Sequence, residues 1–324
     1  MDKNHNKLSD ARSLPAKLCG AGVAVVAAVT ILLVIIPAQA AFVELGAAGF
    51  FTVLSTDQGT QGANIDIGSA ATTISGNVGL GPDSFGTAEK ATINGNLYVD
   101  STSTTSIHPD LLVHGNTFTN QNLSSPVSDA FAASNFFHSL APNQTYGNIT
   151  GNFTFSGGPG RNVISLSSVN TQDTLTISGS ASSQFVFNIT NGFILNGGII
   201  QLTGGVAADN VLFNLVGIGN GATIDKPVGN AVGIFLAPLG DIILDKATLE
   251  GAIIGGGGGN RLTVHSGARL IGVIPEPPTY LAGLLAIAVL LLSHAKLLFV
   301  RKKTSRVDAT GNCCGQKGKN SRRS

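Results

Sequence analysis

Residues 74–78 read ISGNV, and this apolar-x-Gly-Asn-x pattern returns as INGNL at 93–97, VHGNT at 113–117 and ITGNF at 149–153. The glycines at positions 76, 95, 115 and 151 therefore follow one another at intervals of 19, 20 and 36 residues. A turn that recurs about every twenty residues between short β-type segments predicts the coils of a β-solenoid. Gly and Asn suit the corners of such coils because both tolerate positive φ. A β-sandwich of ordinary hairpins is the alternative.

The long interval between the third and fourth copies contains a segment with helical periodicity. Ser125 and Pro126 are typical of an N-cap and a first helical residue. The apolar side chains that share one helical face are Val127, Ala130, Phe131, Ala133, Phe137 and Leu140. We expect a helix of about three to four turns that ends before Pro142 and packs this stripe against the flank of the solenoid.

Short β-type runs fill the second half of the chain. They alternate with Gly, Asn and Asp, and they lie at 175–177, 185–189, 199–202, 211–215, 233–238, 242–244, 251–254 and 262–264. This spacing is typical of an all-β domain. The composition agrees, because 42 glycines, a single methionine and the absence of tryptophan disfavour a helical bundle.

The formal net charge of +1 is the sum of three segments that differ in charge. Residues 1–40 carry four basic and two acidic side chains (+2), residues 41–274 carry six and fourteen (−8), and residues 275–324 carry nine and two (+7). A central segment at −8 repels phosphate, so we expect no nucleic acid partner. The three cysteines (Cys19, Cys313 and Cys314) lie outside this segment, which must therefore be stable without disulfides.

The N-terminus has the features of an export signal. Basic residues precede an apolar run at 18–36, and Ala38-Gln39-Ala40 is typical of a signal-peptidase site before Ala41. We expect residues 1–40 to be a signal peptide that signal peptidase removes. Because the apolar run is long, an uncleaved membrane anchor is the alternative.

The C-terminus carries a second membrane signal. An apolar run at 281–300 is long enough to cross the bilayer as a helix. Pro275, Glu276 and Pro277 precede this run, and the basic cluster of Arg301, Lys302 and Lys303 follows it. A Pro-Glu-Pro motif, an apolar span and a basic cluster in this order resemble the PEP-CTERM sorting signal of exported bacterial proteins.

This resemblance implies processing by an exosortase-type membrane protease at Pro275, Glu276 and Pro277. The preceding domain would then be released to the cell surface or the extracellular matrix. Members of that family usually end soon after the basic cluster, whereas here a polar, basic tail continues over residues 304–324. A form that stays anchored in the membrane by the C-terminal helix is therefore the alternative.

The central segment resembles a second family. The stretches DTLTIS (173–178), QFVFN (184–188) and NVLFN (210–214) are similar to consecutive strands of the bacterial and fungal ice-binding-type β-solenoid, and GIFLAP (233–238) and LEGAII (249–254) to its later strands. They fit equally well the related exported surface domains with varied C-terminal anchors. The resemblance covers most of residues 45–272. It implies an all-β, right-handed, discontinuous β-solenoid with one α-helix packed alongside.

Ice binding would need a flat β face of regularly spaced hydroxyl and methyl groups. The Thr- and Ser-rich stretches lie at 72–73, 101–106, 117–119 and 174–176, and they do not recur at one offset in successive repeats. Thr also suits any exposed strand position. We therefore favour a non-catalytic adhesive or structural role, with matrix polysaccharide as a ligand, and keep ice binding as the first alternative.

A carbohydrate-active enzyme on a β-helix is the second alternative. The densest charged group comprises Asp241, Asp245, Lys246, Glu250 and Arg269. Apolar residues alternate with these charges, so we expect them on the solvent-facing side of strands. The histidines at 108, 114, 138 and 265 show no metal-ligand spacing. The sequence thus predicts no catalytic residue, no cofactor and no metal site.

The predicted chain has four parts. They are a signal peptide at 1–40, an exported β-solenoid domain at 41–274, a sorting signal at 275–303 with a transmembrane helix at 281–300, and a disordered basic tail at 304–324. The expected partners are signal peptidase, an exosortase-type protease, the membrane, and matrix polysaccharide or ice. The expected location is the membrane first, then the cell surface or the extracellular space.

Overall fold

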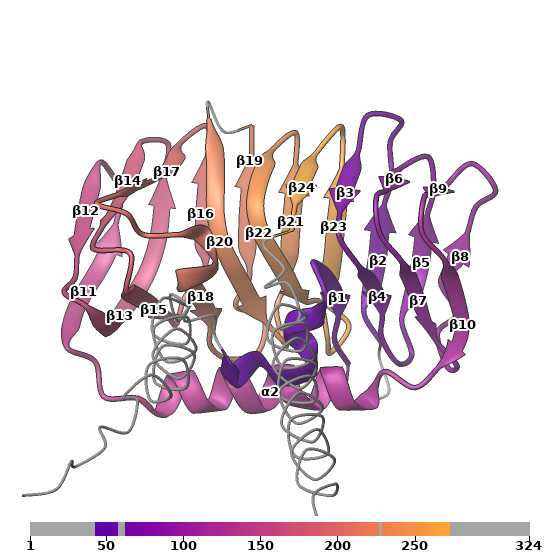
Figure 1. Ribbon diagram of the computed structural model, residues 1–324, viewed down its shortest axis with the longest axis horizontal. Coiled ribbons are helices and arrows are strands. Elements are labelled where there is room, and N and C mark those ends of the chain that lie inside the picture. The colour runs from indigo at the N-terminus through magenta and orange to yellow at the C-terminus, as the bar shows by residue number, and fades with distance from the viewer. Residues whose placement is uncertain (1–42, 58–61, 227–228, 273–324) are drawn as a thin grey trace, which may run out of the picture. The chain divides into compact units, whose positions relative to one another are not determined.

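The computed structural model describes residues 43–57, 62–226 and 229–272. They form a β-solenoid of about ten coils beside one α-helix (Figure 1). Every strand pairing among them is parallel, whereas a sandwich of hairpins would pair its strands antiparallel, so the β-sandwich alternative is wrong. The predicted signal peptide, sorting signal and C-terminal span lie outside the described residues. Within the described ranges, no helix has both the length and the apolar character needed to cross a membrane.

Ten strands form the face that lies against the helix, which we call the covered face. In spatial order they are β11 (Gln144–Ile149), the first half of β13 (Gly160–Thr171), β15 (Ser183–Ile189), β18 (Val211–Leu215), β20 (Asn230–Ala237), β22 (Thr248–Gly255), β1 (Val53–Ser55), β4 (Val78–Leu80), β7 (Leu97–Asp100) and β10 (Thr117–Gln121). Because the core lies on one side and the helix on the other, the middle strands are buried along their whole length; β15 and β18 are examples.

A second face, the open face, is an uninterrupted ladder of eight strands. It runs through the second half of β13, then β16 (Phe193–Asn196), β19 (Ala222–Asp225), β21 (Ile242–Asp245), β23 (Arg261–His265), β2 (Asn64–Ile67), β5 (Phe85–Ala88) and β8 (Ser106–Ile107). Its strands alternate buried and partly exposed residues, as β21 does, because only one side meets the core.

The third face is divided, and we call it the split face. A separate three-stranded sheet contains β12 (Phe153–Ser156), β14 (Thr174–Ser178) and β17 (Ile199–Thr203). The remainder contains the first halves of β20 and β22, then β24 (Arg269–Ile271), β3 (Thr73–Ser75), β6 (Thr92–Ile93) and β9 (Leu112–Val113).

The solenoid is discontinuous, as the sequence resemblance implied. The N-terminal coils follow the C-terminal coils in space, so β1 lies between β22 and β4, with Val53 opposite both Ile253 and Val78. In the same way β2 pairs with β23, and β3 pairs with β24. Figure 1 shows this joint, where the strands of lowest and highest residue number lie side by side.

The interior is filled by aliphatic and phenylalanine side chains stacked from coil to coil. Phe187, Phe213 and Phe235 form a column on β15, β18 and β20, with ring centroids 4.9 and 4.7 Å apart and planes within 15° of parallel. Each is at most 1% exposed. Burial of about 150–250 Å² for each aromatic side chain makes this column a main source of stability.

Helix α2 (Ser124–Ser139) runs along the covered face (Figure 1). Val127, Ala130, Ala133 and Phe137 are buried, which confirms most of the predicted stripe, and the helix ends before Pro142. Its predicted start is two residues too late, because the N-cap is Leu123 and not Ser125, and Leu123 makes no side-chain cap. The Asp100 carboxylate of β7 accepts a 2.7 Å hydrogen bond from the Leu123 N–H instead.

Of the glycines in the Gly-Asn corners, Gly76 has the expected positive φ, at 139°, but the next two are required for a different reason. A Cβ on residue 95 would lie 2.2 Å from the Gly76 carbonyl oxygen, and one on residue 115 would lie 2.4 Å from that of Gly95. These glycines therefore permit close stacking. The asparagines form a ladder: the Asn77 side-chain oxygen accepts from the N–H of residue 96, and that of Asn96 accepts from the N–H of residue 116. The first three copies lead from the split face to the covered face, whereas the copy at 149–153 leads from β11 on the covered face to β12 on the split face.

Candidate binding face

The three faces differ in what they can present to a ligand. Helix α2 and the 3₁₀ segment η1 (Val43–Phe50) pack against the covered face, and the split face is interrupted between β17 and β20. No helix of the described residues packs on the open face, and its eight strands form one hydrogen-bonded ladder. Parallel strands lie about 4.8 Å apart, so each outward position of the open face repeats as a straight row of side chains.

The central row of the open face mixes methyl and hydroxyl groups. From one end to the other it contains Asn170, Ile194, Thr223, Ile243, Thr263, Asp66, Thr87 and Ser106, all in register. Ile194 is 42% exposed even though it is a large aliphatic side chain. Thr223, Ile243 and Thr263 alternate hydroxyl and aliphatic side chains over three neighbouring coils. Asp66 interrupts this alternation in the next coil.

A second row, the edge row, follows the border between the open and split faces. It contains Asn196, Asp225, Asp245, His265, Gly68, Glu89 and His108. Each of three acids in this row pairs with the lysine that follows it in the chain: Glu89 with Lys90 at 3.8 Å, Asp225 with Lys226 at 3.2 Å and Asp245 with Lys246 at 3.6 Å. These lysines have left-handed φ values of 53°, 44° and 50° and form the corner itself.

A hollow of about 400 Å³ opens in the open face where β21, β23, β2 and β5 lie side by side. Its lining residues are Asn64, Ile65, Asp66, Gly86, Thr87, Ile243, Arg261 and Thr263. Gly86 has a φ of 106°, and a Cβ there would lie 2.1 Å from the Ile65 carbonyl oxygen, so no side chain fills this part of the hollow.

The charged groups of the hollow have no partners within the described part of the chain. The described residues include six basic side chains, and four of these (Lys90, Arg161, Lys226 and Lys246) form ion pairs with acids. Among the described residues, neither the Arg261 guanidinium nor the Asp66 carboxylate makes a hydrogen bond or an ion pair. Arg261 and Asp66 are exposed and lie on neighbouring strands. The hollow therefore offers a free donor group, a free acceptor group, two threonine hydroxyls and the methyl groups of Ile243.

The charged group that could have indicated an enzyme is dispersed by the fold. Asp241 accepts a 2.6 Å hydrogen bond from the Arg261 backbone N–H, and Asp245 lies in the edge row. Glu250 lies instead on the split face, between Val232 and Ile271. Lys246 pairs with Asp245, and Arg269 is exposed on the split face. These carboxylates do not converge on one groove, which a glycosidase site requires.

The fold separates most of the residues that the sequence singled out. The stretches 72–73, 117–119 and 174–176 lie on the split, covered and split faces, so none of them contributes a threonine to the central row. The histidines have no ligand spacing in the sequence, but the fold brings His108 close to Glu89 and Asp110. The residues predicted for signal cleavage (Ala38, Ala40, Ala41), sorting (Pro275, Glu276, Pro277) and the membrane stop (Arg301, Lys302, Lys303) lie outside the described residues.

The rows of the open face carry a signal that the sequence prediction missed. The tetrapeptides FILN (193–196), ATID (222–225), IILD (242–245) and LTVH (262–265) each have the form buried-outward-buried-polar. Their starts are separated by 29, 20 and 20 residues. Aligning these tetrapeptides would have placed Thr223, Ile243 and Thr263 in one row.

Comparisons with known proteins agree with this architecture. A crystal structure of a glycosylated ice-binding protein (LeIBP) from an Arctic yeast has a TM-score of 0.51 and 19% identity, over 72% of this chain and 95% of that chain. Another LeIBP structure has a TM-score of 0.50 and 19% identity, with the same coverage of both chains. An ice-binding protein from the Antarctic ascomycete Antarctomyces psychrotrophicus has a TM-score of 0.45 and 22% identity, over 68% of this chain and 97% of that chain.

At these identities, the two LeIBP structures support the β-solenoid fold alone. No curated protein sequence matches the chain. Residues 42–266, which include every strand described above except β24, match the model of a domain family described as ice-binding-like and adhesive. The chain therefore belongs to the family of ice-binding-like adhesive domains.

Proposed function

We propose that this chain is an exported, non-catalytic surface protein that adheres to a hydroxyl-rich polymer, such as a matrix polysaccharide, through its open face. The observation that carries this proposal is the hollow with its unpaired Arg261 and Asp66. A sugar presents hydroxyl groups that both donate and accept hydrogen bonds, and C–H surfaces that pack on apolar side chains. The guanidinium, the carboxylate and Ile243 of the hollow match these three requirements.

Binding to insoluble polysaccharides tests this proposal. The full chain in detergent should sediment with a matrix polysaccharide, and Arg261→Gln and Asp66→Asn should each weaken binding several-fold. Arg269→Gln is the matched control, because Arg269 is the other basic residue without an ion pair among the described residues and lies on the split face. Equal binding by all four proteins would contradict a role for the hollow.

Ice binding is the second candidate function, and the Thr223-Ile243-Thr263 part of the central row favours it. This stretch presents alternating methyl and hydroxyl groups with the spacing of the strands. Inhibition of ice recrystallisation by the full chain would support this candidate. Thr223→Glu should then abolish the inhibition while Arg261→Gln leaves it intact, and the reverse pattern is expected for polysaccharide binding.

Export and sorting form a separate part of the proposal. We propose that residues 1–40 direct export and that residues 275–303 anchor the chain until an exosortase-type protease acts near Pro275, Glu276 and Pro277. The order of the Pro-Glu-Pro motif, apolar run and basic cluster supports this. Intact mass measurement of the native protein in each cell fraction tests it, since processing predicts a released form that ends near residue 277. Finding residues 278–324 attached in every fraction would refute processing.

A further inference from the structure

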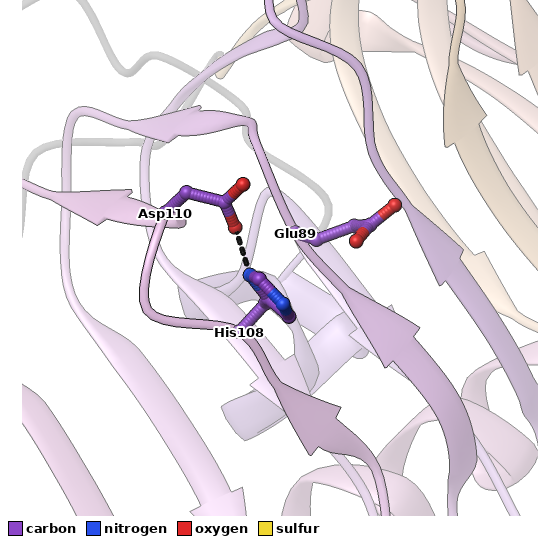
Figure 2. A group of neighbouring side chains, drawn as sticks. All are labelled: Glu89, His108 and Asp110. Atoms are coloured by element: carbon purple, nitrogen blue, oxygen red, sulfur yellow. Dashed lines mark hydrogen bonds and ion pairs between the residues drawn. The ribbon is translucent and has the colours of Figure 1, made fainter.

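Three side chains with metal-ligating groups meet at one end of the edge row: Glu89, His108 and Asp110 (Figure 2). Glu89 follows β5, and His108 follows β8 in the next coil. The Glu89 N–H donates to the Ile67 carbonyl, and the His108 N–H donates to the Ala88 carbonyl, at 2.8 and 2.9 Å. The parallel ladder thus fixes Glu89 and His108 as direct neighbours.

A tight turn brings the third group back to the other two. Pro109 follows His108, and the Leu111 N–H donates a 3.0 Å hydrogen bond to the His108 carbonyl, which closes a four-residue turn. Proline at the second position of such a turn has a fixed φ. The turn places Asp110 beside His108, and the His108 Nδ1 and an Asp110 carboxylate oxygen are hydrogen-bonded partners, as Figure 2 shows.

One ligand atom from each of the three side chains lies within 4.8 Å of the other two. We propose that Glu89, His108 and Asp110 bind one divalent transition-metal ion of the Zn²⁺ class. Zn²⁺ is bound at about 2.0–2.2 Å by imidazole nitrogen and carboxylate oxygen, so small rotations of these exposed side chains bring all three atoms into the coordination sphere. Solvent molecules would complete the coordination.

The chemistry of the three groups favours this class of metal over the alkaline-earth ions. Ca²⁺ takes six to eight oxygen ligands, and Mg²⁺ demands an octahedral set of oxygens. Two carboxylates and one imidazole supply fewer oxygens, and the imidazole suits Zn²⁺, Ni²⁺ and Cu²⁺. Lys90 pairs with Glu89 at 3.8 Å, but its side chain is 53% exposed and free to turn toward solvent, and such surface pairs contribute little.

Zinc titration of the full chain tests the proposal. The protein should be purified in detergent without a polyhistidine tag and with Cys19, Cys313 and Cys314 replaced by serine, because thiolates bind the same metals. Calorimetry and native mass spectrometry should then detect one bound Zn²⁺. Glu89→Gln, His108→Gln and Asp110→Asn should each weaken Zn²⁺ binding by more than about tenfold, the loss caused by removing even an outer partner of a metal ligand.

His114→Gln and Asp83→Asn are the matched controls, since both residues lie in nearby corners outside the cluster, and they should leave Zn²⁺ binding unchanged. The circular dichroism spectrum of each variant checks that the solenoid is intact. The proposal is overturned if the cysteine-free chain binds no Zn²⁺, or if the three cluster substitutions leave binding as strong as the controls do. Tighter binding of Ca²⁺ than of Zn²⁺ would overturn the assignment to a transition metal.

Discussion

The side-chain amides of Asn188 and Asn214 join neighbouring coils under helix α2. Asn214 Nδ2 donates a 2.8 Å hydrogen bond to Asn188 Oδ1, and Asn188 Nδ2 donates to the Phe137 carbonyl at the end of the helix. Asn214 also exchanges hydrogen bonds with Ser134, whose hydroxyl donates to Asn214 Oδ1 at 2.7 Å. This buried network fixes the position of the helix on the covered face.

Replacing Asn214 with leucine should therefore be strongly destabilising. The Asn188 oxygen and the Ser134 hydroxyl would lose buried partners, and the free energy of unfolding should fall by about 2–4 kcal/mol. Urea denaturation followed by circular dichroism measures this. Asn170→Leu is the control, because Asn170 is exposed on the open face and its change should stay within about 0.5 kcal/mol. Similar losses for both variants would contradict the role of the network.

The stacked phenylalanine side chains should contribute strongly to the stability of the solenoid. Phe213 is 1% exposed and stacks against both Phe187 and Phe235. Phe213→Ala should lower the free energy of unfolding by about 3–5 kcal/mol, because it removes buried surface and leaves a cavity between coils. Phe85→Ala provides the comparison, since that ring is 38% exposed. If thermal denaturation shows no greater loss for Phe213→Ala than for Phe85→Ala, the column is not a main support of the core.

Arg161 links three elements, which leads to a third prediction. Its Nη2 donates to Glu44 Oε1 of η1 at 2.6 Å, and its guanidinium lies 5.8 and 5.7 Å from the ring centres of Phe136 and Phe137. Arg161→Gln should lower the free energy of unfolding by about 1–3 kcal/mol, as for other hydrogen bonds to charged groups. Hydrogen exchange in η1 should also become faster. Arg269→Gln should change neither quantity, and an equal effect of both substitutions would refute this link.

Asp209 predicts a pH dependence of stability. Burial raises the pKa of its carboxyl group above the ordinary value, although its backbone hydrogen bond acts in the opposite direction. Its Oδ1 is buried and finds no hydrogen-bond partner among the described residues. Because the folded pKa is the higher one, the contribution of Asp209 to stability is largest in acid and is lost as the pH rises through the folded pKa.

Asp209→Asn should therefore raise the midpoint of thermal unfolding at pH 7 and have little effect at about pH 3, where the aspartate is protonated in both states. Asp83→Asn is a suitable comparison, since Asp83 is exposed. A stabilisation by Asp209→Asn that is equally large at both pH values would show that ionisation is not its cause.

The sequence predicted the features that local patterns determine, and it missed the contacts that form only when coils stack. The recurrence of Gly and Asn predicted the coils, and the apolar stripe from Val127 to Phe137 predicted a helix on their flank, because both patterns are local. The sequence did not reveal that Glu89 and His108 are neighbours, since coil stacking makes that contact. Nor did it show that the Arg261 side chain has no acidic partner among the described residues, because coil stacking directs Asp241, 20 residues earlier, to the Arg261 backbone N–H.

The joint between β22–β24 and β1–β3 has a consequence for how the molecule is made. In a linear repeat array each new repeat stacks on the one before it, and losing an end repeat removes little. Here the coils synthesised first keep an unsatisfied strand edge until the ribosome has made Ile271, about two hundred residues later. Unfolding should then be all-or-none. A chain that stops before β22 would leave the amino-terminal coils without the coils on which they stack, and it would not form a shorter solenoid.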